Sequence, residues 1–579
     1  MYDKKEDIIF NLNNILLSAY EDKKGLSDQL RSENEEFLPY VEDSLKVEYE
    51  KIKAGKKIEV ETDDYPTIMR AINFYSIGEY EQCMWDALRI LENEKEEYLK
   101  CIKIVILSLL ELQSATKFIK KFIPIVKENI DKDEDMLDIL ANIYFKQEDY
   151  AKALPVFEKL VQKYPNDRIG YNYNYKLAYI YERVYQDQYL DKQIELTQKA
   201  ASLTNDDNGV ICFLAKLYHR KGLIEKSDEL FTKAMNNNPK PDMMLGYAHY
   251  LMNTGRLKQG YDVYRNRFKV ESIAYPKVLT DETRWDGKSD LSDCDVIVHY
   301  EQGFGDSVMF SRYIPDLAKM AKSITFVAQK NLISLFKSSG FDKYCHILSH
   351  EADINPNFKA ESRMSSEMFN TGQGMLRIPH DYHIPLADLP YLFDASPENM
   401  VHTEGYLKVD ADKIEAFRKK YLKNSKKIKV GFAYHGTKAS VQTYRDIQAK
   451  KLMPLFKMKE LEFYSFQADE NSMEIDKLDK SLKVHNLAKH FKTFEDTACA
   501  MCCMDLIIST DNVILNLAGA LGVKAYGLFN IYPEARWYKT SGEDIGWYKS
   551  VKPFRVKTFN AWNELMHEVK DSIKQDFNL

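Results

Sequence analysis

The sequence predicts α-helical repeats followed by two α/β domains with parallel sheets. A chain of 579 residues is too long to fold around a single hydrophobic core, so several domains are expected. Residues 63–270 repeat one helical pattern, whereas short β-rich runs alternate with helical segments after Ala274. We therefore assign α/β domains to 285–400 and 401–579, and charged helices to residues 1–62.

The clearest repeat begins at Glu134 and fits a 34-residue frame. The residues typical of a tetratricopeptide repeat stand at positions 8, 11, 20, 24 and 32 of that frame: Ala141, Tyr144, Ala153, Phe157 and Pro165. A second copy places the same kinds of residue at Ala215, Tyr218, Ser227, Phe231, Ala234 and Pro239. Weaker copies surround these two, one of them stretched by an insertion near residues 186–190.

The repeat spacing has a physical cause. Small side chains let paired helices approach, aromatic side chains fill the space between neighbours, and proline ends the second helix. Such solenoids commonly present a concave surface to a peptide or protein. The alternative is an array that is purely structural or that forms a homo-oligomer.

The first α/β domain opens with a strand, a glycine loop and a helix, predicted at 296–299, 300–306 and 308–321. Ligands bind at the carboxyl ends of such strands, and glycines there allow close approach to the backbone. Asp306 has two interpretations, a helix cap or a carboxylate that accepts a proton in the cleft. Segment 383–386 is predicted to be a loop.

The second α/β domain places polar residues after predicted strands at 428–434, 462–466 and 505–509. Those residues are Lys438, Arg445, Gln467, Asp511 and Asn512. Because the carboxyl ends of parallel strands meet at one edge, we expect these side chains to converge on one cleft. The backbone N–H groups of a helix at 513–521 could hold an anion such as a diphosphate, assisted by Lys438 and Arg445. The alternative for each basic side chain is simple solvation.

Composition excludes several function classes. The net charge of −7 provides no electrostatic footprint for nucleic acid, and no apolar run approaches the ~18 residues of a membrane span. The first residues do not resemble a signal peptide, and the eight cysteines are scattered, so we expect a cytoplasmic protein with free thiols. Cys499 and Cys502 lack a second pair that would complete a zinc site and are expected to be core residues on a helix at 495–503.

Several motifs occur in order between residues 285 and 556. They are EQGFGDSVMFSRYIPDLA, HIPLADLP, VGFAYHG followed by Tyr444-Arg445-Asp446, Ser465-Phe466-Gln467, FEDTACAMCCMDLIISTDNVILNLAGALGVKAYGLF, and Arg536-Trp537 with Gly546-Trp547-Tyr548. In these motifs the chain resembles the C-terminal domain of bacterial tetratricopeptide-repeat glycosyltransferases. Those proteins are related to the heptosyltransferase family and, more distantly, to O-linked N-acetylglucosamine transferases.

The resemblance implies a GT-B type pair of Rossmann-like domains, the first binding the acceptor and the second the nucleotide-sugar, with no metal and no further cofactor. Asp306 occupies the position of the aspartate thought to act as base in heptosyltransferases. Their donor-site Asp-Thr-x-x-x-His segment corresponds to residues 511–516, where Asp511 is retained but Asn512 and Asn516 replace threonine and histidine. An amide cannot titrate as an imidazole does, so this departure leaves open a weakened or inactive member.

The expected reaction is inverting transfer of a sugar to a protein recruited by the repeats, with flagellin or another surface protein expected from related proteins. Asp306 would deprotonate the acceptor hydroxyl, while Lys438, Arg445 and helix amides would stabilise the leaving phosphate. Donor contacts are expected from Gln467, Asp511, Asn512 and Asn516, and acceptor contacts from Glu301, Gln302, Gly303 and Gly305. The alternatives are a non-catalytic binding module and a transferase for a saccharide or lipid-linked acceptor.

Overall fold

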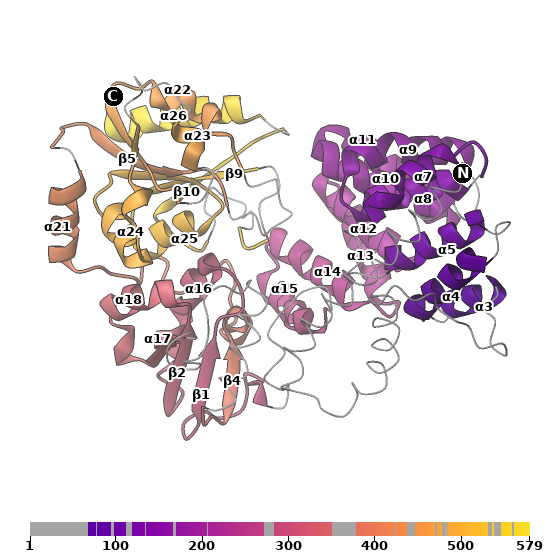
Figure 1. Ribbon diagram of the computed structural model, residues 1–579. Helices are drawn as coiled ribbons and strands as arrows, with labels where there is room; N and C mark the ends of the chain where they lie inside the picture. The colour runs from indigo at the N-terminus through magenta and orange to yellow at the C-terminus, as the bar shows by residue number, and fades with distance from the viewer. Residues whose placement is uncertain are drawn as a thin grey trace, which may run out of the picture. The chain divides into compact units, whose positions relative to one another are not determined.

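The computed structural model separates into two compact units, residues 1–210 and 211–579 (Figure 1). It describes residues 68–76, 78–93, 98–111, 119–133, 135–165, 170–204, 207–270, 283–349, 378–422, 424–436, 446–468, 472–476, 482, 484–530, 535–537, 546–558 and 561–579. The predictions for residues 1–62, Lys438 and Arg445 fall outside these ranges.

The first unit consists of helices in its described part. They are α3 (Ile68–Ser76), α4 (Tyr80–Asn93), α5 (Tyr98–Glu111), α7 (Ile123–Glu128), α8 (Asp135–Lys146), α9 (Tyr150–Lys163), α10 (Gly170–Tyr185) and α11 (Leu190–Leu203). Ala141, Ala153 and Phe157 of the clearest repeat are fully buried, as the close approach of α8 and α9 requires. A short 3₁₀ turn, Gln186–Tyr189, occupies the predicted insertion between α10 and α11.

Further repeat helices are α12 (Asn208–Arg220), α13 (Ile224–Met235), α14 (Pro241–Asn253) and α15 (Leu257–Tyr264), followed by the 3₁₀ turn Arg265–Lys269. The small residues again mark a close crossing, because the Oγ of Ser227 on α13 donates to the carbonyl of Ala215 on α12 at 2.8 Å. Across the described ranges of both units, no helix combines the length and apolar character that would let it cross a membrane.

The first α/β domain is built on a four-stranded sheet in the order β3-β2-β1-β4, in which all neighbours run parallel. The strands are β1 (Asp295–His299), β2 (Ser323–Ala328), β3 (His346–Ser349) and β4 (Tyr382–Pro385). The prediction of a loop at 383–386 is wrong, because β4 pairs with β1 with Val296 opposite Tyr382. β4 is an edge strand, where Pro385 is tolerated although it lacks a backbone donor.

The helix after β1 also differs from its prediction. It begins at Phe304 rather than Val308 and is broken into α16 (Phe304–Phe310), a 3₁₀ turn (Ser311–Tyr313) and α17 (Ile314–Leu317). Pro315 explains the break, since it has no N–H to bond the carbonyl four residues earlier. Gly303 holds the N-cap position, so the interpretation of Asp306 as the cap is wrong and Asp306 instead lies within the first turn.

The second α/β domain contains a six-stranded sheet in the order β10-β9-β8-β5-β6-β7, also with parallel neighbours. Its strands are β5 (Ile428–Ala433), β6 (Leu461–Ser465), β7 (Val484–Asn486), β8 (Leu506–Thr510), β9 (Ala525–Phe529) and β10 (Val551–Arg555). Neither β7 nor β10 was expected from the sequence pattern. Both flank the sheet as edge strands, where the apolar pattern is weaker.

Helices cover both faces of this sheet (Figure 1). Ile507 of β8 packs toward α24 (Phe494–Met501) and α25 (Val513–Ala520), whereas Leu506 and Ile508 pack toward α26 (Trp562–Phe577). The remaining α-helices are α18 (Lys330–Ser338), α20 (Leu389–Leu392), α21 (Ala411–Tyr421), α22 (Met453–Phe456) and α23 (Met473–Asp476). The predicted fold class, helical repeats followed by a GT-B type pair of parallel α/β domains, is confirmed.

Candidate active site

Asp306 of the first α/β domain forms an ion pair with Arg536 of the second. Asp306 lies in the first turn of α16, immediately after β1 and the glycine loop. Its Oδ1 is 2.9 Å from the Nε of Arg536, and the two side chains are 21% and 15% exposed. Asp306 was a candidate site residue from the sequence. Arg536 was not, because the sequence showed it only as part of the motif Arg536-Trp537.

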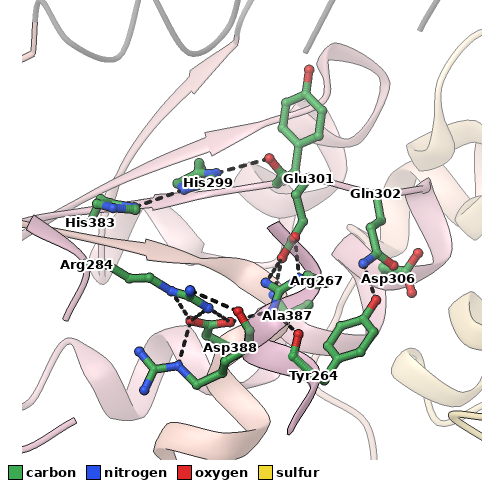
Figure 2. Close-up of polar contacts among 12 residues, drawn as sticks. Tyr264, Arg267, Arg284, His299, Glu301, Gln302, Asp306, His383, Ala387 and Asp388 are labelled. Atoms are coloured by element: carbon green, nitrogen blue, oxygen red, sulfur yellow. Dashed lines mark hydrogen bonds and ion pairs between the residues drawn. The ribbon is translucent and has the colours of Figure 1, made fainter. Parts of the chain in front are cut away.

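The guanidinium of Arg536 has two further partners near the glycine loop. Its Nη2 donates to the Oε1 of Gln302 and to the hydroxyl of Tyr264, the latter at 3.3 Å. The Nε2 of Gln302 donates to the same hydroxyl at 2.5 Å, as Figure 2 shows. Tyr264 is the last residue of α15, so a repeat helix contributes to the surroundings of Asp306.

Glu301, the residue before Gln302, has its carboxylate engaged by protein groups. Both of its oxygens are held by Arg267, at 2.7 and 2.6 Å, and the backbone N–H of Ala387 adds a bond at 3.1 Å (Figure 2). Arg267 and Glu301 are 0% and 1% exposed at their side chains. This arrangement fixes the end of β1, and contact of Glu301 with an acceptor stays a prediction.

Three arginines surround the buried carboxylate of Asp388. Arg267, Arg284 and Arg265 all reach it, at 2.8, 2.6 and 3.3 Å. Burial alone would raise the pKa of Asp388, but the three positive charges outweigh burial and lower it. The network ties the turn after α15 to the turn after β4, beneath the glycine loop.

His299, the last residue of β1, stacks on His383 of the neighbouring strand β4. The Nε2 of His299 is 3.3 Å from the Nδ1 of His383, and their ring centroids are 5.5 Å apart (Figure 2). Burial lowers the pKa of His299 to about 4. The ring of His299 is therefore neutral near pH 7.

The glycine loop also touches helix α25 of the second α/β domain. A Cβ placed on Gly305 would lie 3.0 Å from the Nδ2 of Asn516. Asn516 in turn accepts a bond from the hydroxyl of Tyr548 at 3.4 Å and donates to the carbonyl of Asn512 at 3.4 Å. Glycine at 305 therefore permits the first turns of α16 and α25 to approach each other.

Asn512 caps α25. Its Oδ1 accepts bonds from the N–H groups of Ile514 and Leu515, at 2.9 and 3.4 Å, and from the Oγ of Ser509 at 2.9 Å. Its Nδ2 donates to the carbonyl of His435 at 3.2 Å, which ties the ends of β5 and β8 together. Two N–H groups of this helix start are thus already bonded, and diphosphate binding there stays a prediction.

Gln467 and Asp511 lie at the carboxyl ends of β6 and β8. The Oε1 of Gln467 accepts from the N–H groups of Tyr434 and His435, both at 3.1 Å, and its Nε2 donates to the carbonyl of His435 at 3.3 Å. Asp511 is 5% exposed. Burial lowers the pKa of Arg555 to about 10, and the nearby charge of Asp511 opposes that shift.

The structure thus brings most of the predicted site residues into two groups. Gln302, Gly303, Gly305 and Asp306 surround the start of α16, and Gln467, Asp511, Asn512 and Asn516 follow the strands of the second sheet. The contact of Gly305 with Asn516 joins the groups. Among the described residues, no set of three or more His, Cys, Asp and Glu side chains is arranged to hold a metal ion.

The two CxxC cysteines lie at and just beyond the end of α24. Cys499 is buried within α24, and burial raises its pKa to about 12. Burial likewise raises the pKa of Cys502 to about 11. Cys499 is a small core residue, as predicted. Cys502 is only partly buried and follows the last residue of α24, so the predicted helix at 495–503 ends two residues earlier than expected.

Comparison with known proteins supports the helical half directly. Residues 136–167 match the family model of the tetratricopeptide repeat. The chain carries a tetratricopeptide repeat. This match confirms the prediction that was based on the 34-residue spacing.

Longer parts of the chain are similar to known proteins at low identity. It is 23% identical over 379 residues to Protein FlbA of Caulobacter vibrioides, a match that covers 62% of this chain and 61% of FlbA. The chain therefore spans less than two thirds of the length of FlbA. Among solved structures, ADP-heptose LPS heptosyltransferase II of E. coli is 11% identical, with a TM-score of 0.35 over 49% of this chain and 99% of that one. A family 9 glycosyl transferase of Veillonella parvula is 12% identical, with a TM-score of 0.33 over 50% and 91%.

Proposed function

We propose that the chain is a glycosyltransferase that moves a sugar from a nucleotide-sugar to a protein, with inversion at the anomeric carbon. The observation that carries this proposal is the position of Asp306. Its carboxylate follows the carboxyl end of β1, where parallel α/β domains bind ligands, and it faces a group of the second α/β domain through its ion pair with Arg536. The sequence resemblance described above supports the reaction class.

In this reaction the acceptor hydroxyl oxygen forms a bond to the anomeric carbon of the sugar. The bond between that carbon and the phosphate oxygen breaks, and its electron pair leaves with the nucleoside diphosphate. The hydroxyl proton moves to the carboxylate of Asp306. A base in this role must be ionised beforehand, and a neighbouring guanidinium favours the charged carboxylate. No metal is proposed for the step.

The second α/β domain holds the donor in this proposal. Asp511 binds sugar hydroxyls, while Gln467, Asn512 and Asn516 line the donor site, and Lys438 and Arg445 contact the phosphates. The repeats recruit the acceptor, for which flagellin or another surface protein is our leading candidate, and the reaction takes place in the cytoplasm. The confirmed tetratricopeptide repeat supports a protein acceptor over a saccharide.

The test begins with the donor. A thermal-shift screen against UDP, GDP, ADP, CMP and their sugars identifies the nucleotide, because any ligand that binds the folded state stabilises it. Transfer is then measured with that donor for the full chain and for Asp306→Asn. We expect Asp306→Asn to lose turnover by about 10²-fold or more while nucleotide binding is unchanged.

Asp316→Asn is the matched control. Asp316 lies on α17, ten positions later in the sequence, and pairs with Lys319 at 2.7 Å and His402 at 2.8 Å. We expect this control to keep wild-type turnover. Near-full turnover in Asp306→Asn would remove Asp306 from the mechanism.

A non-catalytic binding module is the second candidate, and Asn516 is the observation that favours it. Asn516 stands at the position where the family that the sequence resembles has a histidine. Its side chain is neutral, accepts a hydrogen bond from Tyr548 and donates one to Asn512. This candidate predicts no thermal shift with any nucleotide-sugar at millimolar concentration. A clear shift with one nucleotide would instead favour the enzyme.

A further inference from the structure

Arg536 connects three parts of the chain that are distant in sequence. Its Nε is 2.9 Å from Asp306, and its Nη2 donates to Gln302 and Tyr264. Nε and Nη2 share one edge of the guanidinium, so the planar group meets all three partners in one orientation. The position of the Asp306 carboxylate is therefore coupled to the position of the Tyr264 hydroxyl.

The backbone of Arg536 is anchored in the second α/β domain. Its carbonyl accepts a bond from the indole nitrogen of Trp547. The next residue, Trp537, is 1% exposed and packs against Phe529 and Tyr548, with ring centroids 5.2 and 6.1 Å apart. The guanidinium therefore extends from a fixed base toward the first α/β domain.

Tyr264, at the end of the last repeat helix, is also fixed in position. It is 3% exposed, and its ring lies 4.8 Å from the guanidinium carbon of Arg267. Arg267 also donates to the carbonyl of Tyr264 at 3.2 Å while it binds Glu301. The hydroxyl of Tyr264 thus has little freedom, and Gln302 and Arg536 orient toward it (Figure 2 shows the bond with Gln302).

We propose that Arg536 is a positioning residue for Asp306 and that Tyr264 orients Arg536, so that the last repeat helix completes the active site. This inference rests on the proposed function, because it takes Asp306 as the base. A base that is misplaced by about 1 Å can cost 10²-fold in rate. The repeats then have two tasks, recruiting the acceptor and holding the catalytic geometry.

The inference is tested by steady-state kinetics of the full chain. Tyr264→Phe keeps the ring and removes the hydroxyl, and we expect kcat to fall by about 10-fold with an unchanged KM for the nucleotide-sugar. Arg536→Lys keeps the positive charge but loses the planar guanidinium that reaches several partners at once. We expect its kcat to fall by about 10²-fold. Millimolar guanidinium ion should restore part of the activity of Arg536→Ala, which a merely structural role of Arg536 would not allow.

Tyr526→Phe is the matched control for the loss of a hydroxyl. The hydroxyl of Tyr526 bonds Ser572 at 3.1 Å and Asp576 at 2.5 Å, both on α26. We expect this variant to lose some thermal stability and to keep kcat within about twofold. If Arg536→Lys does not fold, Gln302→Met, which removes both amide contacts at similar length, takes its place and should also lower kcat without changing KM.

The outcomes separate the two proposals. Wild-type kcat in Tyr264→Phe and Arg536→Lys, with an active wild-type protein, would overturn the positioning role alone. No turnover by the wild-type protein with any nucleotide-sugar would overturn the proposed function and this inference with it. A selective loss of kcat, together with guanidinium rescue, would establish the coupling.

Discussion

Arg267 and Glu301 form a fully buried, bidentate ion pair between the turn after the last repeat helix and the end of β1. The pair is extended by the bond from Arg267 to Asp388 at 2.8 Å. Buried charges of this kind are stable only with all of their partners in place, because neither ion can return to water. The junction between repeats and first sheet therefore depends on this network.

Removing one charge of the pair should be costly. We expect Glu301→Gln to lower the free energy of unfolding by about 3–5 kcal/mol, since it leaves Arg267 buried with a weakened partner. Urea denaturation followed by circular dichroism measures the change. Glu415→Gln removes a carboxylate whose pair with Arg418 is about half exposed, and it should change stability by less than about 0.5 kcal/mol. Equal stability of the two variants would contradict the importance of the buried pair.

Gly305 should not tolerate a methyl group. In Gly305→Ala the Cβ would approach the Nδ2 of Asn516 to 3.0 Å, so α16 and α25 must separate or Asn516 must move. We expect a loss of about 1–3 kcal/mol in unfolding free energy and a lower rate of transfer. In Gly303→Ala the nearest atom, the Oδ2 of Asp306, lies at an ordinary 3.6 Å, so this control should be tolerated.

A double variant tests the cause of that loss. Adding Asn516→Ala to Gly305→Ala removes the side chain that the new methyl group meets. The two changes should then be non-additive, with the double variant more stable than the sum of the single effects predicts. Strict additivity would place the strain of Gly305→Ala elsewhere.

Stability should fall as the solution becomes acidic. Burial lowers the pKa of His299 and of His219 to about 4, below the ordinary value near 6.5 of an unfolded histidine. Between these values the unfolded chain binds protons that the folded chain refuses, so stability is full above about pH 6.5 and declines toward pH 4. The loss should reach about 3 kcal/mol for the fully buried His299.

Urea unfolding at several pH values measures this slope. The variant His299→Gln keeps a polar side chain that cannot titrate, and we expect its stability to depend less steeply on pH between 6.5 and 4. An unchanged slope would mean that His299 is not the group responsible.

The thiols of Cys499 and Cys502 should resist alkylation in the folded protein. Because burial raises the pKa of Cys499 to about 12 and of Cys502 to about 11, little thiolate is present at pH 8. We expect iodoacetamide to modify both residues far more slowly in buffer than in 6–8 M urea, as read by peptide mass spectrometry. Rapid labelling of Cys499 in the native protein would contradict its burial.

Local patterns were sufficient for the repeats and most strands. The 34-residue spacing predicted the helices around Ala141 and Phe157, and buried apolar runs predicted strands such as β5 and β8 within one or two residues. β4 was missed because a four-residue edge strand that ends in Pro385 looks like a turn in sequence. The break before α17 follows from Pro315, whose effect a periodic apolar pattern conceals.

The candidate site was predictable only in part. Asp306 stood out because a glycine loop after a strand is a local signal. Its partner Arg536 lies 230 residues later, and Tyr264, to which Arg536 donates, lies 42 residues earlier than Asp306. No local pattern relates such residues. The role of Glu301 in a buried pair was hidden for the same reason, since Arg267 lies in the turn after the last repeat helix.

The apolar core of the first α/β domain extends beyond the sheet into the last repeat helix, α15. Leu257, Tyr261 and Tyr264 of α15 belong to the same buried cluster as Trp285 and Val296. A lineage could therefore gain or lose repeats upstream of α14 without disturbing this core, whereas recombination between α15 and β1 would split it. Exchange of repeats among relatives should accordingly leave the last helical pair joined to the first α/β domain, so that the two are inherited as one segment.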